Sequence, residues 1–214
     1  KHVYALELFI RSQEGAPKRI KVACNNMYHL LTSIVACNRQ KAVPIIFPPG
    51  EKMIKFVDYD KIAESEFEIN DINCIVQCNE VDNRENIFYN ESDVQCVLFT
   101  SGTEMSPKAV ELSFSNIYNS VLNWNKVMEF NSDDRYLNIL PLWHISGLSI
   151  FFRSIYCCFH SIVSEYDKSN FMTSINKYNI NCISVVPKII RDIICLDNGD
   201  AFKHIKAFIV GGDR

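Results

Sequence analysis

The stretch that decides the fold is residues 94–99, Val-Gln-Cys-Val-Leu-Phe, followed by the polar loop 100–107, Thr-Ser-Gly-Thr-Glu-Met-Ser-Pro. Residues 94–99 are the most apolar strand candidate in the chain, and the run predicts a buried strand. Buried strands of this kind are typical of parallel sheets, where loops at the carboxyl ends collect ligands. Three further predicted strands end at residues 140, 186 and 210, so these ends are the other places to look for a site.

Strands and helices alternate on both sides of this stretch. The apolar spacing predicts strands at 20–24, 42–47, 72–76, 94–99, 109–112, 136–140, 161–164, 182–186 and 205–210. It predicts helices at 26–38, 51–65, 116–129, 147–158, 169–178 and 188–195, the third of them capped by Ser113 or Ser115. This alternation predicts an α/β fold with mainly parallel sheets flanked by helices.

Composition excludes several classes of protein. A net charge of −3 over 214 residues argues against a nucleic-acid binder with a broad basic face. No apolar run reaches the roughly 18 residues that a membrane span needs. The nine cysteines form no Cys-x-x-Cys pair and suggest no metal site, which favours free thiols in a reducing cytoplasm. Because the chain starts without Met and stops just after a predicted strand, we expect a piece of a longer protein.

The loop after residue 99 carries four hydroxyls, one glycine and then Lys108. Hydroxyls, backbone N–H groups and a lysine are what a polyphosphate needs, although an ordinary polar turn has the same composition. The loop is not a Walker loop.

Three other strand ends carry candidate residues. His144 lies in Leu140-Pro141-Leu142-Trp143-His144-Ile145-Ser146-Gly147-Leu148, although a lone histidine is more often structural than catalytic. Pro187 ends the strand that contains Val185 and Val186. Gly211 and Gly212 follow the last strand, where a simple glycine turn is the alternative.

Residues 98–110 and 140–148, about forty residues apart, resemble the two signature segments of the adenylate-forming superfamily, which includes the acyl-CoA synthetases. The first signature reads Tyr/Phe-Thr-Ser-Gly-Thr-Thr-Gly-x-Pro-Lys-Gly-Val and the second Pro-Leu-Phe/Tyr-His-x-x-Gly-Leu. The resemblance implies the large N-terminal domain of that fold, which uses ATP, Mg²⁺, CoA and a small carboxylic acid. The wider string 140–154, with Arg153 on its helix, most resembles the o-succinylbenzoate–CoA ligases of menaquinone biosynthesis; a helix-surface charge is the alternative for Arg153.

The resemblance also implies a role for each candidate residue. His144 and Lys108 would be the catalytic residues, with His144 beside the acyl carboxylate. The ATP-binding residues would be Thr100, Ser101, Gly102, Thr103, Lys108, Gly211 and Gly212. Val185, Val186 and Pro187 would join His144 in lining the acyl pocket.

The chain departs from the superfamily pattern at Glu104, Met105 and Ala109. Glu104 brings a negative charge to a phosphate loop, and Met105 replaces a glycine. We expect residues 1–90 to form a first α/β part and 91–214 the phosphate-loop and acyl-pocket part. The main Mg²⁺ ligand and a C-terminal domain are expected beyond residue 214, so the chain alone should be inactive. The alternative is a non-catalytic nucleotide-binding or scaffolding relative.

Overall fold

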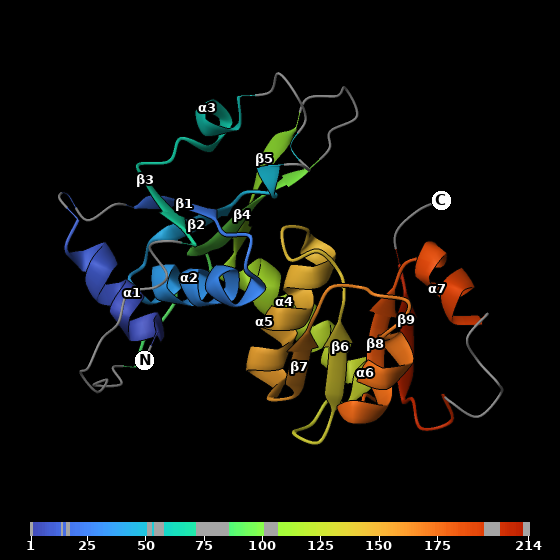
Figure 1. Ribbon diagram of the computed structural model, residues 1–214. Helices are drawn as coiled ribbons and strands as arrows, with labels where there is room; N and C mark the ends of the chain where they lie inside the picture. Colours follow the sequence, from blue (N-terminus) through green and yellow to red (C-terminus); the bar gives the residue numbers. More distant parts are fainter. Residues whose placement is uncertain are drawn as a thin grey trace. The chain divides into compact units, whose positions relative to one another are not determined.

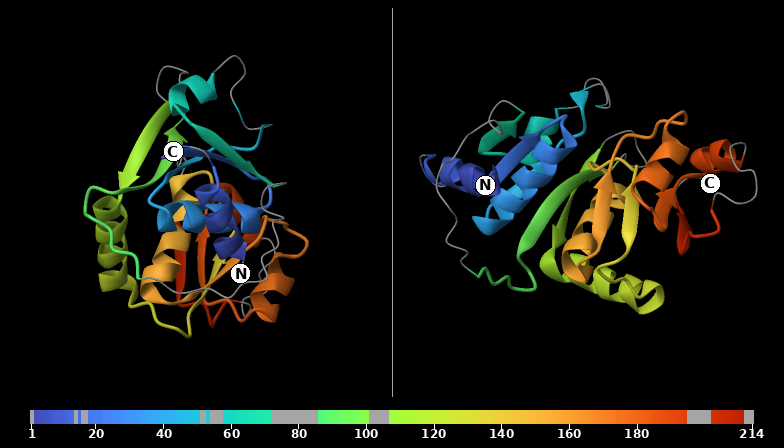
Figure 2. Two further views of the ribbon diagram at one scale, coloured as in Figure 1. Left: turned by 90° about the vertical axis from the view of Figure 1, so that its left-hand side faces the viewer. Right: turned by 60° about the horizontal axis from the view of Figure 1, so that its bottom comes forward.

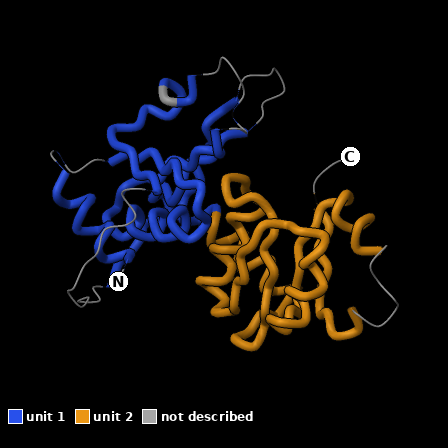
Figure 3. Tube along the Cα trace, viewed as in Figure 1, with its two compact units in different colours: residues 1–116 blue, residues 117–214 orange. Residues whose placement is uncertain are grey.

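A computed structural model describes residues 2–13, 15, 18–50, 53, 58–71, 86–100, 107–194 and 202–211 (Figures 1 and 2). The chain forms two compact units, residues 1–116 and 117–214 (Figure 3). The predicted division near residue 90 therefore differs from the observed one. The reason is that the strand after residue 93 pairs with the first sheet rather than starting a new one.

The first unit is built on a five-stranded sheet with the order β3-β1-β2-β4-β5. All neighbouring strands pair in parallel except β4 and β5, which form an antiparallel hairpin. The strands are β1 (Arg19–Ala23), β2 (Val43–Ile46), β3 (Phe67–Asn70), β4 (Val94–Thr100) and β5 (Lys108–Ser113). Four of the five were predicted. β3 was not, and the predicted strand 72–76 lies outside the described residues.

The described residues of this unit also form the helices α1 (His2–Arg11), α2 (Met27–Arg39) and α3 (Tyr59–Ala63). The prediction for α2 is confirmed, and its cap is Asn26, whose side chain accepts the backbone N–H groups of Tyr28 and His29. Of the predicted helix 51–65, the structure describes a helix at Tyr59–Ala63, and Asp58 before it accepts the N–H of Lys61 with its carboxylate. Residues 51, 52 and 54–57 of that prediction lie outside the described residues. Helix α1 was not predicted.

The second unit is built on a four-stranded parallel sheet with the order β7-β6-β8-β9. Its strands are β6 (Arg135–Asn138), β7 (His160–Val163), β8 (Cys182–Val185) and β9 (Ala207–Val210). Its helices are α4 (Phe114–Met128), α5 (Ile145–Cys157), α6 (Phe171–Lys177) and α7 (Pro187–Ile194). All eight elements were predicted, and the α/β class with parallel sheets is confirmed.

Helix α4 starts where the sequence predicted. Of the two candidate caps, Ser113 is the one used, because its hydroxyl accepts the backbone N–H of Asn116 at 3.2 Å. The Asn116 side chain in turn accepts the backbone N–H of Ser113 at 3.0 Å. This reciprocal pair is the arrangement of a capping box.

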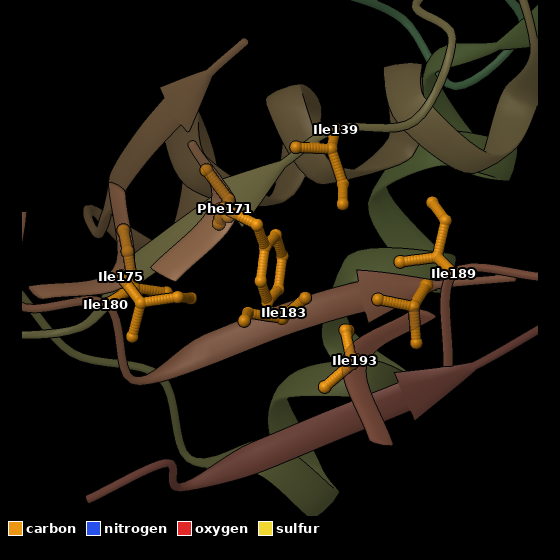
Figure 4. Packing of buried hydrophobic residues seen from close by; sticks show 9 residues of the cluster. Ile139, Phe171, Ile175, Ile180, Ile183, Ile189 and Ile193 are labelled. Atoms are coloured by element: carbon orange, nitrogen blue, oxygen red, sulfur yellow. The ribbon is translucent and has the colours of Figure 1, made fainter. Parts of the chain in front are cut away.

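The two faces of the β6–β9 sheet differ in chemistry. One face packs on α6 and α7 through an apolar cluster (Figure 4) that consists of Leu137, Ile139, Phe171, Ile175, Ile180, Ile183, Val185, Ile189 and Ile193. The other face packs on α4 and α5 and combines apolar residues with Tyr136 and Ser184, whose hydroxyls lie 2.6 Å apart. Polar chemistry within this sheet is therefore concentrated on the α4/α5 face.

The strand order places a topological switch between β6 and β8. The chain leaves β6 through α5 to reach β7, and later leaves β8 through α7 to reach β9 on the opposite side. Crevices at such switch points, outside the carboxyl ends of the strands, are where open α/β sheets bind ligands.

An ion pair between a buried carboxylate and a partly exposed lysine lies at the amino edge of this sheet. Lys206 donates to the Asp134 carboxylate at 2.8 Å, and Asn181 donates to its second oxygen at 2.8 Å. Burial opposes the charge, but these bonds and the N–H of Asn131 hold the Asp134 pKa below its usual value. The polar groups of Asp134, Lys206 and Asn181 at the amino edge therefore satisfy one another and stabilise the fold.

Six of the nine cysteines lie in the described residues, and each is a free thiol there. Burial raises the pKa of Cys96 to about 12 and that of Cys182 to about 11, so both remain protonated at neutral pH. Within the described part of the chain, no helix is both long enough and apolar enough to cross a bilayer.

Candidate functional site

Three of the four predicted strand ends meet at one edge of the second sheet. Because β6, β8 and β9 run parallel, the residues that follow them lie at the same edge. His144 follows β6, Val186 and Pro187 follow β8, and Gly211 follows β9. The structure therefore brings these predicted site residues to the switch point of the sheet.

His144 occupies the N-cap position of α5. Its backbone N–H donates to the carbonyl of Pro141 at 3.2 Å, and its carbonyl accepts the N–H of Leu148. Its side chain makes no capping hydrogen bond within the described residues, so the imidazole is available to a ligand. The ring is exposed at one side and lies 6.1 Å from the ring of Trp143.

Partial burial lowers the pKa of His144 below 6.5. At pH 7 the ring is therefore mostly neutral, with one nitrogen that donates and one that accepts. A neutral imidazole at the start of a helix stands beside N–H groups that favour negative charge. This combination can bind a carboxylate without a formal positive charge.

Gly147 fixes how α5 approaches the end of β6. A Cβ atom built on Gly147 would lie 2.5 Å from the carbonyl oxygen of Leu140 and 2.4 Å from that of Pro141. Side chains do not tolerate such distances to backbone atoms. Only glycine lets the first turn of α5 lie directly against the loop that carries His144.

Gly211 is held by the neighbouring strand. Its N–H donates to the carbonyl of Val185 at 3.1 Å, which extends the β8–β9 ladder by one bond. No described atom lies within 4 Å of a Cβ built on Gly211. The packing of the residues that the structure describes therefore does not require glycine at position 211, whereas it does at Gly147.

The residues predicted to line the acyl pocket separate into two kinds. The Val185 side chain is 1% exposed and belongs to the apolar cluster on the α6/α7 face. Val186 is half-buried and packs against the clusters on both faces, and Pro187 is the first residue of α7. Val186 and Pro187 thus lie at the edge, while the side chain of Val185 is a core residue.

The hairpin of β4 and β5 carries the remaining predicted site in the first unit. Thr100 and Lys108 pair at the last rung, where the Thr100 hydroxyl donates to the Lys108 carbonyl at 3.5 Å. Both residues are exposed, and Pro107 beside them is buried. Ser101, Gly102, Thr103, Glu104 and Met105 lie outside the described residues, as does Gly212.

A buried polar cluster on the α4/α5 face was missed by sequence reasoning. Arg153 of α5 is 5% exposed, so its interpretation as a helix-surface charge is wrong. Its guanidinium lies over the Trp124 ring at 4.7 Å and donates to the Ser149 carbonyl and hydroxyl at 3.1 and 2.8 Å. Its Nη1 is buried and has no hydrogen-bond partner among the residues that the structure describes.

Tyr136 adds to this cluster from β6. Burial raises the Tyr136 pKa, while its hydrogen bond with Ser184 and the nearby Arg153 charge act against the rise. Burial likewise lowers the pKa of Arg153. A buried cation with a free donor is a favourable site for an anion, because an unpaired buried charge is costly.

A cavity of about 230 Å³ opens at the carboxyl ends of β6 and β7, on the α6 side. Its lining includes Glu165 and Asp167 together with Ser164, Asn170 and Ser174. Among the described residues, no three side chains of His, Cys, Asp or Glu gather as they would to hold a metal ion.

Alanine substitution at Gly147 and at Gly211 should affect the stability of the protein to very different extents. Gly147→Ala should lower the free energy of unfolding by about 3 kcal/mol, because the clash outweighs the helix propensity of alanine. Gly211→Ala should change it by less than about 0.5 kcal/mol. Urea unfolding followed by circular dichroism measures both, and equal effects would contradict the packing difference.

The pKa of His144 is directly measurable. Titration of the ring carbon-bound protons by NMR should give a midpoint below 6.5, because desolvation disfavours the protonated ring. Stability should therefore weaken as the pH falls from the unfolded pKa towards the lower folded one. A peptide of residues 140–148 is the control; an equal or higher pKa in the protein would contradict the burial of this ring.

Comparison with known proteins identifies a family that includes the candidate site. Residues 50–214 match the family described as AMP-binding enzyme. The chain is 36% identical over 104 residues to the 2-succinylbenzoate–CoA ligase of Staphylococcus aureus strain JH9, which covers 48% of this chain. The matched part spans only 21% of that relative's length.

Solved structures share the fold. The o-succinylbenzoate coenzyme A synthetase from Bacillus subtilis in complex with AMP superposes with a TM-score of 0.80 at 22% identity, over 99% of this chain and 59% of that one. The N-terminal domain of FACL13 from Mycobacterium tuberculosis gives a TM-score of 0.82 at 14% identity, over 99% of this chain and 61% of that one. With the family match covering more than half of the residues, the chain belongs to the AMP-binding enzyme family.

Proposed function

We propose that this chain is an N-terminal part of an ATP-dependent carboxylate–CoA ligase. Such an enzyme joins a carboxylate to the α-phosphorus of ATP, releases pyrophosphate, and then transfers the acyl group to the thiol of CoA with loss of AMP. The observation that carries the proposal is the meeting of His144, Val186, Pro187 and Gly211 at one sheet edge. The name of the S. aureus relative supports the same reaction.

The chain's own residues suit the first of these steps. The His144 imidazole, neutral at pH 7, donates a hydrogen bond to the acyl carboxylate and leaves it nucleophilic. The uncapped N–H groups at the start of α5 stabilise negative charge near the same point. Binding and orientation are therefore the contributions of this edge, rather than proton transfer.

The nucleotide is assigned to two further segments. We propose that Thr100, Ser101, Gly102, Thr103 and Lys108 contact the phosphates, and that the adenine lies against the bare backbone of Gly211 and Gly212. No atom of the described residues lies within 4 Å of a Cβ at Gly211, which leaves room for a ring against the backbone there. We propose that the main Mg²⁺ ligand lies beyond residue 214, as the family resemblance implies.

The buried Arg153 points to the class of acid. Succinylbenzoate, which the name of the S. aureus relative contains, carries two carboxylates. Ligation to a single CoA would leave the other carboxylate free. The second needs a cation, and Arg153 offers one with an unpartnered Nη1. Its guanidinium reaches back to Ser149, which is about 7.5 Å along the helix from His144.

The cavity on the α6 side is the less suitable place for such an acid. Glu165 and Asp167 line it, and their charges would repel a dicarboxylate. We therefore place the acid on the α4/α5 face, between His144 and Arg153, with Val186 and Pro187 at its side. A dicarboxylic aromatic acid is the substrate class that this face fits best.

The activity is tested with the full-length protein by acid-dependent exchange of pyrophosphate into ATP. Lys108→Ala should lower the exchange rate about 10- to 100-fold, because a charge-assisted hydrogen bond to phosphate is lost. Lys61→Ala, an exposed lysine of α3, is the matched control and should leave the rate unchanged. Residues 1–214 alone should show no exchange.

The rival function is a non-catalytic nucleotide-binding or scaffolding relative, which Glu104 and Met105 of the phosphate loop favour. Nucleotide binding by the full-length protein without exchange for any acid would establish that rival. Exchange at a rate that Lys108→Ala does not alter would instead remove Lys108 from the site.

A further prediction concerns the binding of the acid by Arg153. Arg153→Met should raise the KM for 2-succinylbenzoate about 10- to 100-fold, since a hydrogen-bonded charge pair is lost. The same variant should turn over an analogue that lacks the second carboxylate as well as the wild type does. A KM for the dicarboxylate that does not change, in a variant that unfolds at the wild-type temperature, would rule out Arg153 as its partner.

A further inference from the structure

Asn138, the last residue of β6, is a completely buried polar residue that sequence reasoning did not identify. Its Nδ2 donates to the carbonyl of Gly147 at 2.9 Å, inside the first turn of α5. Its Oδ1 accepts the N–H of Leu140 at 3.4 Å. One side chain therefore joins the strand end, the following loop and the helix start.

These bonds surround the loop that carries His144. The loop leaves β6 at Asn138 and re-enters regular structure at α5, which starts with Ile145. Asn138 holds both ends of this segment, and the backbone of His144 is held within it by Pro141 and Leu148. The missing side chain of Gly147 allows the two ends to approach so closely.

The burial of this amide has a specific consequence. If a buried amide loses a hydrogen-bond partner, its own polar group remains unsatisfied, which costs free energy. The conformation in which both Asn138 bonds form is therefore strongly preferred over conformations in which either is broken. The first turn of α5 consequently has one register against β6. The backbone position of His144 is fixed together with this turn, because His144 is the residue immediately before the helix.

We propose that Asn138 is a positioning residue of the ligase reaction, which fixes the imidazole of His144 at the carboxyl edge of the sheet. The proposal rests on the proposed role of His144. Asn138 is buried and takes no part in the chemistry, so its effect passes through the placement of the ring. A displacement of about 1 Å at a reacting centre is enough to lower a rate by up to about 100-fold.

The same sheet supplies a matched control at its opposite edge. Asn181 also uses both ends of its amide, donating to the Asp134 carboxylate at 2.8 Å and accepting the N–H of Arg135 at 2.8 Å. It links β6 to the chain just before β8, at the amino edge, with no bond to the His144 loop. Loss of either amide removes two hydrogen bonds. Only the Asn138 amide, however, is bonded to the segment that carries His144.

The experiment uses the full-length protein with labelled histidine, and compares Asn138→Ala, Asn138→Asp and Asn181→Ala. The His144 ring signals are assigned by their loss in His144→Gln. Both Asn138 variants should shift these signals and lower kcat for pyrophosphate exchange about 10- to 100-fold, with the KM for ATP unchanged. Asn181→Ala should lower the unfolding temperature without altering the His144 signals or kcat.

Asn138→Asp keeps the size and one acceptor of the side chain but replaces the donor to Gly147 with a carboxyl oxygen, so it breaks the same bond without leaving a cavity and gives a second test where Asn138→Ala does not fold. Unchanged ring signals and kcat in a folded Asn138 variant would overturn the positioning role. An equal loss of kcat in Asn181→Ala would also overturn it, because general destabilisation would then explain both. If His144→Gln itself keeps the wild-type rate, the proposed role of His144 fails instead.

Discussion

The contact between Gly147 and the backbone carbonyls of Leu140 and Pro141 is the constraint on which the candidate site depends. It is a backbone-to-backbone approach, so no rotamer change can relieve it. It allows α5 to begin directly against the end of β6, and this start places an N-cap histidine, uncapped N–H groups and a buried amide within one short segment. The chemistry at this edge follows from that single close approach.

The other parts of the second sheet support this edge rather than compete with it. The Asp134–Lys206 pair closes the amino edge, and the apolar cluster of α6 and α7 fills one face. The remaining face holds Tyr136, Ser184 and Arg153, the last with a donor that the described protein does not satisfy. Asn38 Oδ1 and Ser161 Oγ are also buried without a hydrogen-bond partner among the described residues, but of these three groups only Arg153 carries a charge. A buried charged donor costs most when it is left unsatisfied, and the proposed carboxylate ligand would satisfy it.

The sequence predicted the second unit well, because its strands and helices have strong periods and clear ends such as Pro187. It predicted less of the first unit. The short strand β3 alternates only Phe67 and Ile69 with polar residues, and α1 buries Glu7 through an ion pair with Arg39 that no local pattern indicates. Such elements are decided by partners far away in the chain.

The candidate site divides in the same way. His144 and Gly211 were predicted because they follow strands within recognisable motifs, and the structure brings them to one edge. Arg153 was identified by its place in a motif, but its burial, the role of Asn138 and the core position of the Val185 side chain could not be predicted. Burial and hydrogen-bond partners depend on which face of the sheet each residue meets. Motif position identifies the edge, and tertiary packing decides which side chains reach it.

The unequal chemistry of the two faces of this sheet has a consequence for how the protein can change. On the α6/α7 face, where only apolar volume matters, one aliphatic residue can replace another with a modest effect on folding. On the α4/α5 face, a single replacement alters charge or hydrogen bonding next to the site. With the acid placed on the α4/α5 face as proposed, substrate range can diverge through a few α5 and β8 positions while the scaffold beneath them stays intact, and a library for altered acid preference belongs on that face.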